Sequence, residues 1–218
     1  SLFKDAERDL LVTLPQPSEK NLPDYYQSED YISHTDSKRN LLEIAYQLVK
    51  QFYLKRKVKL VTRVNQGQGR ILDVGCGTGD FLQACEQKGW SIAGIEPNEK
   101  ARQLASTKTN FKDYQRTVED LIESNPESFD VITMWHVLEH VPNLADFIHK
   151  IKSLLKPNGV LVVAVPNFKS WDAKHYNSFW AAYDVPRHLW HFSRKSMEII
   201  FSEFDMKILE ELPMKFDS

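Results

Sequence analysis

The sequence has little of what several large classes of protein need. Its 218 residues include only two cysteines, Cys76 and Cys85, so neither a disulfide framework nor a cysteine-rich metal site is expected, and a cytoplasmic location is the simplest interpretation. No apolar run approaches the roughly 18 residues that a membrane-spanning helix needs. The formal net charge of −2 gives no overall attraction to nucleic acid. The apolar fraction of 42% is nevertheless enough for a packed core, and the length suits one α/β domain with an appendage.

A glycine-rich segment is the most informative feature of the chain. Ile71, Leu72 and Val74 predict a short buried strand, and residues 75–79 (GCGTG) follow it directly, with a helix beginning at their end. Glycines are needed where the backbone turns tightly or where a ligand approaches more closely than a Cβ allows. The spacing is G-x-G-x-G and not the G-x-G-x-x-G of dinucleotide-binding turns, so the pattern favours a different ligand.

Two carboxylates accompany this turn. Asp73 lies two residues before Gly75, where it would repel a diphosphate but would suit a ligand with an ammonium group. Glu96 follows the next predicted strand, residues 90–95, at the place where an acid can accept hydrogen bonds from both hydroxyls of a ribose. An amine, a ribose and a chain between them describe S-adenosylmethionine better than a nicotinamide dinucleotide. The alternative is a purely structural glycine turn with a solvated Glu96.

Four segments together resemble the class I S-adenosylmethionine-dependent methyltransferases, in particular the ubiquinone-biosynthesis-like small-molecule group. They are residues 72–79, 94–96, 129–141 and 154–166, in the order and spacing of that family. The resemblance implies an α/β fold with a Rossmann-like, doubly wound and mostly parallel sheet. It also implies S-adenosylmethionine as cofactor and S-adenosylhomocysteine as product. The segments before and after match less specifically and would carry the choice of substrate.

The order of the expected elements agrees with this fold. Apolar runs predict strands near residues 70–74, 90–95, 110–114, 128–134 and 158–166, and helical patterns lie near 78–88, 98–107, 143–155 and 193–204. We expect residues 66–218 to form the S-adenosylmethionine-binding domain. Residues 1–65 would be an irregular N-terminal segment followed by a helical cap, whose helix begins at Asp36 or Ser37 and runs through Val64.

The C-terminal end of the sequence departs from the family. Residues 206–216 resemble a sixth strand, and only two residues follow them. The last, antiparallel strand of the family would therefore be missing from the chain, and a truncated end is the expectation.

Further cofactor contacts are implied by position within the family. Thr117 stands where relatives have an Asp that reaches the adenine amine, so this contact passes to Thr117 or Glu119, and the N–H of Val118 could meet a ring nitrogen. A helix N-cap at Thr117 is the alternative. Trp135 and His136 leave the sheet beside the sulfonium. The expected cofactor-binding residues are Asp73, Gly75, Cys76, Gly77, Gly79, Glu96, Pro97, Thr117, Val118, Glu119, Trp135 and His136.

Residues 168–192 form a long segment rich in tryptophan and histidine, which we interpret as a lid over the methyl acceptor. An oxygen acceptor benefits from a general base, and histidine is suited to this role near neutral pH. His136 and His188 are therefore the candidate catalytic residues. An ion pair between Asp184 and Arg187 that only pins the segment is the alternative. The expected acceptor-binding residues are Trp180, Tyr183, Arg187, His188 and His191.

No metal site is expected. Some relatives of the ubiquinone type hold a divalent metal with two acids and a histidine at the places of His136, Glu139 and His140, but here a histidine replaces the first acid. These residues would share one face of a helical turn. We expect Glu139 and His140 to make buried hydrogen bonds instead.

The sequence thus predicts an enzyme that methylates a small organic acceptor, with oxygen as the favoured acceptor atom. Three alternatives remain open. A non-catalytic S-adenosylmethionine-binding protein would keep the glycine turn without turnover. A nucleic-acid methyltransferase would use the basic cluster of residues 55–59, which is otherwise the solvent-facing side of a helix. A nicotinamide dehydrogenase is disfavoured by the glycine spacing and by Asp73.

Overall fold

The computed structural model describes residues 1–18, 25, 41–122 and 126–214. Contacts within the chain divide it into two compact units. One comprises residues 29–135 and 150–162, and the other comprises residues 1–28, 136–149 and 163–218. The predicted domain boundary between residues 65 and 66 stays a prediction.

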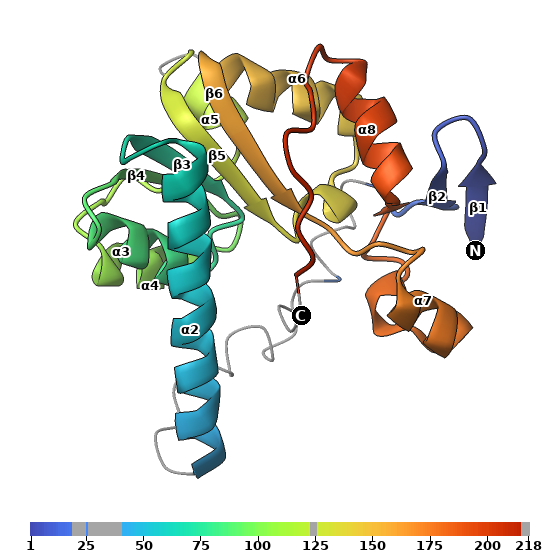
Figure 1. The fold of residues 1–218 in the computed structure, drawn as a ribbon, viewed down its shortest axis with the longest axis horizontal. Helices are drawn as coiled ribbons and strands as arrows, with labels where there is room; N and C mark the ends of the chain where they lie inside the picture. The colour runs from blue at the N-terminus through green and yellow to red at the C-terminus, as the bar shows by residue number, and fades with distance from the viewer. Residues whose placement is uncertain (19–24, 26–40, 123–125, 215–218) are drawn as a thin grey trace. The chain divides into compact units, whose positions relative to one another are not determined.

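The unit that contains the glycine-rich segment is built on a four-stranded sheet (Figure 1). The strands are β3 (Arg70–Val74), β4 (Ser91–Ile95), β5 (Phe129–Trp135) and β6 (Leu155–Ala164), in the order β4-β3-β5-β6. Strand β3 pairs in parallel with both β4 and β5. The predicted α/β fold with a parallel sheet is confirmed. Strand β4 lies on one side of β3, and β5 and β6 lie on the other, so the strand order reverses at β3. In such sheets ligands bind at the carboxyl ends of the strands beside this point.

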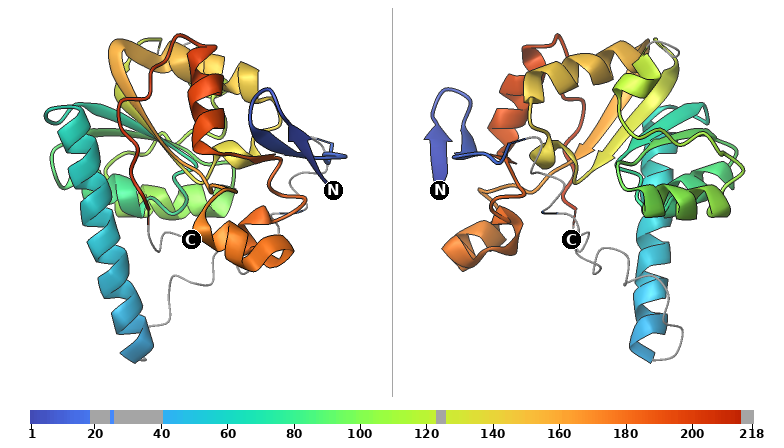
Figure 2. Two further views of the ribbon diagram at one scale, coloured as in Figure 1. Left: turned by 45° about the vertical axis from the view of Figure 1, so that its right-hand side comes forward. Right: turned by 180° about the vertical axis from the view of Figure 1, so that it is seen from behind.

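Helices flank this sheet (Figures 1 and 2). They are α2 (Leu41–Val64), α3 (Asp80–Glu86), α4 (Glu99–Lys108), α5 (Glu119–Ile122) and α6 (Leu144–Leu154), the last of which begins in the other unit. Val58 and Val61 of α2 pack with Phe81 and Leu82 of α3 in one buried cluster that includes Ile71 of β3. This burial of apolar surface holds α2 and α3 against the sheet. The predicted end of α2 at Val64 is confirmed, whereas its predicted start lies outside the described residues.

Two predicted strands do not form. At residues 110–114 there is no strand, and only Gln115 makes an isolated bridge to Ile95. Instead, the Tyr114 ring occupies the space beside Gly94, where an added Cβ would lie 2.5 Å from that ring. Among residues 206–214 no regular structure is present. Leu209 and Leu212 are 75% and 50% exposed, so the apolar residues that suggested a strand bury too little surface against a neighbour to hold one.

The second unit holds a three-stranded sheet that the sequence does not predict. Its elements are β1 (Leu2–Asp5), β2 (Leu10–Thr13), η2 (Leu138–His140), α7 (Trp171–Tyr176), η3 (Asn177–Phe179), η4 (Ala181–Tyr183), β7 (Trp190–His191) and α8 (Arg194–Ser202). Strands β1 and β2 form an antiparallel hairpin, and β2 pairs with β7. The expectation that the N-terminal residues are irregular was therefore wrong for residues 2–13. The partner strand β7 lies nearly 180 residues further along the chain, beyond the reach of local sequence patterns.

Polar contacts fasten the hairpin to the rest of this unit. Asp9, in the hairpin turn, accepts hydrogen bonds from Lys169 Nζ and Ser193 Oγ, both at 2.6 Å. Ser193 also begins α8, as predicted, through a capping box with Ser196. The hairpin thus holds both ends of the 168–192 segment.

Candidate functional site

The turn after β3 is built from three glycines with left-handed backbone conformations. The φ angles of Gly75, Gly77 and Gly79 are 72°, 54° and 79°, values that residues with a Cβ rarely adopt. The backbone N–H groups of Gly75 and Cys76 donate to the Ile95 carbonyl at 2.8 and 3.0 Å, and the N–H of Gly79 donates to the Cys76 carbonyl at 3.0 Å. These donors are used within the protein, so they do not form a free cradle for a phosphate group.

Glu96 joins this turn to the end of β4. Its carboxylate is buried and accepts hydrogen bonds from the N–H groups of Gly77 and Asn98, both at 2.9 Å. Burial raises the pKa of Glu96, whereas these two backbone donors act to lower it. Because each carboxylate oxygen has more than one acceptor site, Glu96 can still accept hydrogen bonds from a ligand.

Asp73 lies within β3 and is 2% exposed. Its Oδ1 accepts a hydrogen bond of 2.6 Å from Thr133 Oγ1 on the adjacent strand β5. Burial raises the pKa of Asp73 to about 7, although the hydrogen bond from Thr133 acts in the opposite direction. A carboxyl group with such a pKa changes its charge near neutral pH, and a ligand cation would favour the ionised form.

Two glycines of the turn differ in what surrounds them. A Cβ added at Gly79 would lie 2.8 Å from the Cβ of Ala105, so Gly79 permits the close packing of α4. A Cβ added at Gly77 would meet nothing within 4 Å in the described structure. Gly77 therefore leaves open space beside the Glu96 carboxylate. Cys76, between Gly75 and Gly77, is buried, and burial raises the pKa of its thiol.

The residues predicted to contact the adenine have protein partners. The N–H of Thr117 donates to Asp120 Oδ2 at 2.9 Å, and Glu119 forms an ion pair of 2.7 Å with Lys150. Val118 is buried. Pro97 follows Glu96, and its carbonyl accepts a hydrogen bond from Arg102. Their roles toward a cofactor stay predictions.

Trp135 ends β5 and packs beside the helices of its unit. Its ring meets the Phe81 ring edge-on, with 5.6 Å between centroids, and Lys57 Nζ lies 4.4 Å from the centre of the Trp135 ring. The indole Nε1 is buried and has no hydrogen-bond partner among the described residues. Buried indole N–H groups usually find a partner, so this donor is available to a ligand group.

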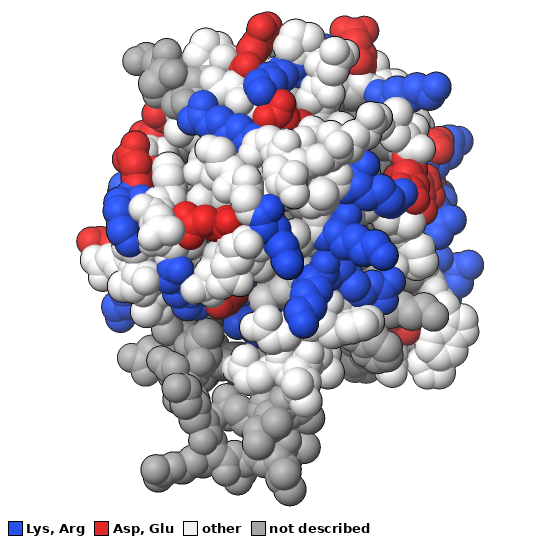
Figure 3. All heavy atoms as spheres, turned by 60° about the vertical axis from the view of Figure 1, so that its left-hand side comes forward, with Lys and Arg blue, Asp and Glu red and all other residues white. Residues whose placement is uncertain are grey.

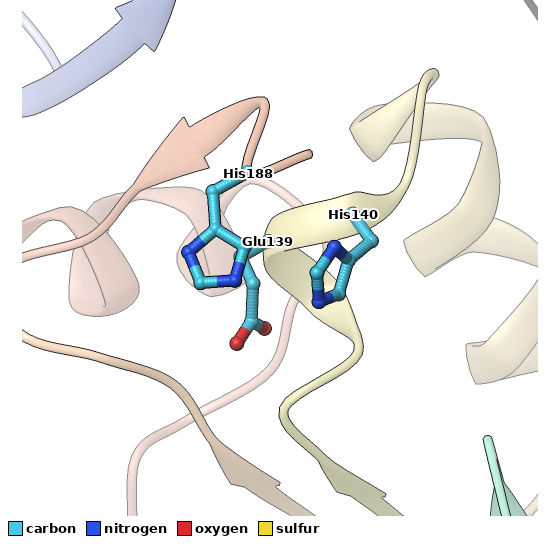
Figure 4. A group of neighbouring side chains, drawn as sticks. All are labelled: Glu139, His140 and His188. Atoms are coloured by element: carbon cyan, nitrogen blue, oxygen red, sulfur yellow. The ribbon is translucent and has the colours of Figure 1, made fainter. Parts of the chain in front are cut away.

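Glu139, His140 and His188 meet in the second unit, and Figure 4 shows their side chains together. One polar atom from each lies within 4.8 Å of the others. The Glu139 side chain is 1% exposed, and within the described ranges neither of its oxygens has a hydrogen-bond partner. The expectation that this carboxylate makes buried hydrogen bonds was therefore wrong. For His140 the expectation holds, because its Nδ1 lies 3.2 Å from the Arg187 carbonyl.

His136 begins this stretch of the second unit with a left-handed φ of 57°. Its N–H donates to the Ala164 carbonyl at 3.0 Å, and its Nδ1 lies 3.4 Å from Glu139 Oε1. Its Nε2 is buried and lacks a hydrogen-bond partner in the part of the chain that is described. The predicted role of His136 as a base stays a prediction.

Residues of the 168–192 segment contact one another and the hairpin. Arg187 pairs with Asp184 at 2.9 Å, the contact that was the alternative to acceptor binding. The ring of Tyr183 lies edge-on to Trp180 at 5.2 Å and to His191 at 5.6 Å. Burial lowers the pKa of His191 to about 4, so its ring is neutral at physiological pH. The roles of Trp180, Tyr183, Arg187, His188 and His191 toward an acceptor stay predictions.

Thr13 is a residue of this site that sequence reasoning missed. Its buried hydroxyl donates to the His188 carbonyl at 2.6 Å and lies 3.0 Å from His191 Nε2. Because the single hydroxyl hydrogen is used on the carbonyl, the oxygen accepts from Nε2–H of His191. Thr13 thus fixes the backbone beside His188 and the tautomer of His191. Its position in an apolar strand gave no signal of this role.

Comparisons with known proteins identify the family. Residues 46–211, most of the chain, match the model of a family described as methyltransferase domain. The chain belongs to this family. It is 41% identical over 113 residues to a ubiquinone biosynthesis O-methyltransferase of Histophilus somni, and this match covers 47% of this chain and 48% of the relative. It is 43% identical over 107 residues to a ubiquinone biosynthesis O-methyltransferase of Haemophilus ducreyi, and this match covers 45% of each. The matches span about half the length of these curated relatives.

Solved structures support the fold. A magnesium protoporphyrin IX methyltransferase from Synechocystis with bound SAH has a TM-score of 0.62 at 18% identity and covers 88% of this chain and 90% of its own. A SAM dependent methyltransferase from Archaeoglobus fulgidus has a TM-score of 0.57 at 24% identity and covers 72% and 67%. Among the described residues, no helix has both the length and the apolar composition that crossing a membrane requires.

Proposed function

We propose that this chain binds S-adenosylmethionine at the turn after β3 and transfers its methyl group to a small organic acceptor at oxygen. The observation that carries the cofactor assignment is the use of the turn's backbone donors. The N–H groups of Gly75, Cys76, Gly77 and Gly79 are all bonded within the protein. A dinucleotide would need such donors for its pyrophosphate, whereas S-adenosylmethionine has no phosphate.

The two buried acids complement the remaining groups of this cofactor. Asp73, at the carboxyl end of β3, would face the ammonium group, and Glu96, at the end of β4, would accept the ribose hydroxyls. The open space beside Gly77 would admit the chain between them. The sulfonium makes the methyl carbon reactive by itself. An acceptor oxygen forms the new O–C bond while the C–S bond breaks, and the protein mainly aligns the two reactants and excludes water.

Oxygen is the proposed acceptor atom because the curated relatives are named O-methyltransferases. A hydroxyl must lose its proton during the transfer, and His136 and His188 are the proposed bases. His136 has a buried Nε2 with no described partner, whereas His188 has its Nδ1 committed at 2.8 Å to the Ala182 carbonyl. We propose that the 168–192 segment binds the acceptor, through the residues predicted from the sequence, and that the chain works in the cytoplasm.

Turnover tests this proposal against a non-catalytic cofactor-binding protein. The full chain should release S-adenosylhomocysteine when it is given S-adenosylmethionine with a panel of phenols and catechols, and much less with matched anilines. Release with anilines only would contradict oxygen as the acceptor atom. Saturable cofactor binding without turnover across phenols, amines and thiols would support the non-catalytic alternative.

A nucleic-acid substrate is the remaining alternative. Basic side chains gather on one face of the molecule (Figure 3). Of the basic cluster in α2, Lys55, Arg56 and Lys59 are exposed. Binding through such charges would weaken steeply with salt. We expect no gel shift with RNA or DNA at physiological salt, and a salt-dependent shift with methylation of the nucleic acid would overturn the small-molecule assignment.

A further inference from the structure

Asp73 and Thr133 are neighbours in the parallel pair of strands β3 and β5. The two residues are register partners, so their side chains leave the sheet on the same face. Asp73 is 2% exposed, and Thr133 is fully buried. A buried carboxylate destabilises the folded chain unless hydrogen bonds or a cation compensate for its lost hydration. The Thr133 hydroxyl therefore lies where Asp73 needs a donor.

The hydroxyl of Thr133 donates to Asp73 and not to the backbone. Thr133 Oγ1 lies 2.6 Å from Asp73 Oδ1 but 3.4 Å from the Leu72 carbonyl. Hydrogen bonds between two oxygens span about 2.5–3.0 Å, and those to an ionised acceptor span about 2.5–2.7 Å. A hydroxyl has a single hydrogen, so the short contact to Asp73 takes it. No other described residue donates a hydrogen bond to this carboxylate.

We propose that Thr133 is a positioning residue for the cofactor, which acts by holding the Asp73 carboxylate ionised and fixed in rotation. Because Thr133 uses Oδ1, the second oxygen, Oδ2, is left for the ammonium group of S-adenosylmethionine. This role rests on the cofactor assignment proposed above. A threonine within the apolar run of residues 128–134 is otherwise expected only as a residue that favours strands.

The charge state of Asp73 depends on groups from several elements. Burial raises the pKa of Asp73 to about 7, and the hydrogen bond from Thr133 and the charge of Lys57 in α2 act against this rise. Glu96, which follows β4, adds to the rise by repulsion. The other titratable groups that interact with Asp73 are neutral near pH 7 because burial raises their pKa values, and they are Cys76, Cys85 and Tyr114.

The role of Thr133 has a consequence for the pH dependence of cofactor binding. An ammonium group binds the ionised carboxylate, so affinity for S-adenosylhomocysteine should fall about tenfold between pH 8 and pH 6 as Asp73 takes up a proton. Without the hydroxyl of Thr133 the carboxylate ionises less readily, and the midpoint of this fall should move to higher pH. A residue that only fills space in the sheet would leave the midpoint unchanged.

Thr133→Val tests the proposal because it removes the donor and keeps the β-branched shape. In calorimetric titrations of the full chain at pH 6, this variant should bind S-adenosylhomocysteine at least about tenfold more weakly than the unaltered chain. Binding of 5′-methylthioadenosine, which lacks the amino-acid end, should stay within about threefold. Thr133→Ser keeps the hydroxyl and should restore the pH profile. Thr109→Val, at another buried threonine of this unit, is the matched control and should leave the ratio of the two affinities unchanged.

The outcomes separate this role from the cofactor assignment. If the unaltered chain does not bind S-adenosylhomocysteine, the cofactor assignment is wrong and the role of Thr133 is wrong with it. If the unaltered chain binds but Thr133→Val keeps the same affinity and pH profile, only the role of Thr133 is overturned. An equal loss of affinity for both ligands in Thr133→Val would likewise show that Thr133 is a structural residue.

Two further variants keep the proposal testable if Thr133→Val fails to fold, which circular dichroism reports. The thiol of Thr133→Cys is a weak donor of similar size, so this variant should show the same upward shift of the midpoint. In the background of Asp73→Asn, adding Thr133→Val should cause no further loss of affinity for S-adenosylhomocysteine, because the carboxylate through which Thr133 acts is gone. An unshifted midpoint in Thr133→Cys, or an additive loss in the double variant, would overturn the proposal.

Discussion

A substitution of Glu96 can distinguish a structural role of this carboxylate from a role in cofactor binding. In the variant Glu96→Gln the side chain keeps its size, but one carboxylate oxygen becomes an NH₂ group. That group would face a backbone N–H, either of Gly77 or of Asn98, where Glu96 now accepts hydrogen bonds of 2.9 Å. A buried donor left without an acceptor costs about 1–3 kcal/mol, so the free energy of unfolding should fall by that amount.

The same substitution should weaken binding of S-adenosylhomocysteine. A hydrogen bond from a ribose hydroxyl to a carboxylate contributes about 1.5–3 kcal/mol, which corresponds to roughly 10–150-fold in the dissociation constant. Calorimetric titration measures the affinity, and urea denaturation measures the stability. Glu99→Gln is the matched control, because Glu99 is exposed in the first turn of α4. We expect its affinity within threefold and its stability within about 0.5 kcal/mol of the unaltered chain.

The two measurements give separable outcomes. If Glu96→Gln is less stable but binds S-adenosylhomocysteine as tightly as the unaltered chain, the carboxylate only shapes the turn and the ribose assignment is wrong. If neither quantity changes, the hydrogen bonds to Gly77 and Asn98 themselves are refuted.

Further substitutions test three other parts of the account. Burial raises the pKa of Asp73 from 3.8 to about 7, so the contribution of Asp73 to stability is full below pH 3.8 and is lost as the pH rises to 7. Asp73→Asn should remove this loss of about 4 kcal/mol, which urea titrations at pH 4 and pH 8 measure. An unchanged pH dependence in the variant would contradict the shift. Both glycines have left-handed backbones, which should cost an alanine about 1–2 kcal/mol of unfolding free energy, and this is the whole cost expected for Gly77→Ala. Gly79→Ala should cost about 2–5 kcal/mol because its Cβ would in addition clash with α4. Equal losses in the two variants would refute the packing role of Gly79. Thr13→Val should destabilise the chain by about 1–3 kcal/mol because it leaves the buried His188 carbonyl without its hydrogen-bond donor, whereas Thr13→Ser keeps the hydroxyl and should be nearly neutral. Thermal melting measures both variants, and equal effects would show that the hydroxyl is unimportant.

The sequence predicts the glycine-turn unit well because its signals are local. Ile71, Leu72 and Val74 are apolar in succession, as in strands covered on both faces, and all three are buried. The positive φ angles of the three glycines follow directly from the turn they make. Asp73 lies near the carboxyl end of β3 and Glu96 directly follows β4, and the parallel pairing of these strands brings both residues to one edge of the sheet.

The second unit could not be predicted in the same way because its contacts join distant segments. The pairing of Leu11 with His191, the hydrogen bond from Thr13 to His188 and the meeting of His188 with Glu139 are each set by tertiary packing. No periodicity within a short window reports such pairs. Local patterns also failed at residues 110–114, where the Tyr114 side chain packs beside Gly94 and no strand forms.

Titration of the full chain with S-adenosylhomocysteine and, separately, with NAD tests the central claim most directly. The account predicts saturable binding of one S-adenosylhomocysteine per chain, weakened in Glu96→Gln, and no measurable heat with NAD. Saturable binding of NAD together with no response to S-adenosylhomocysteine would contradict it.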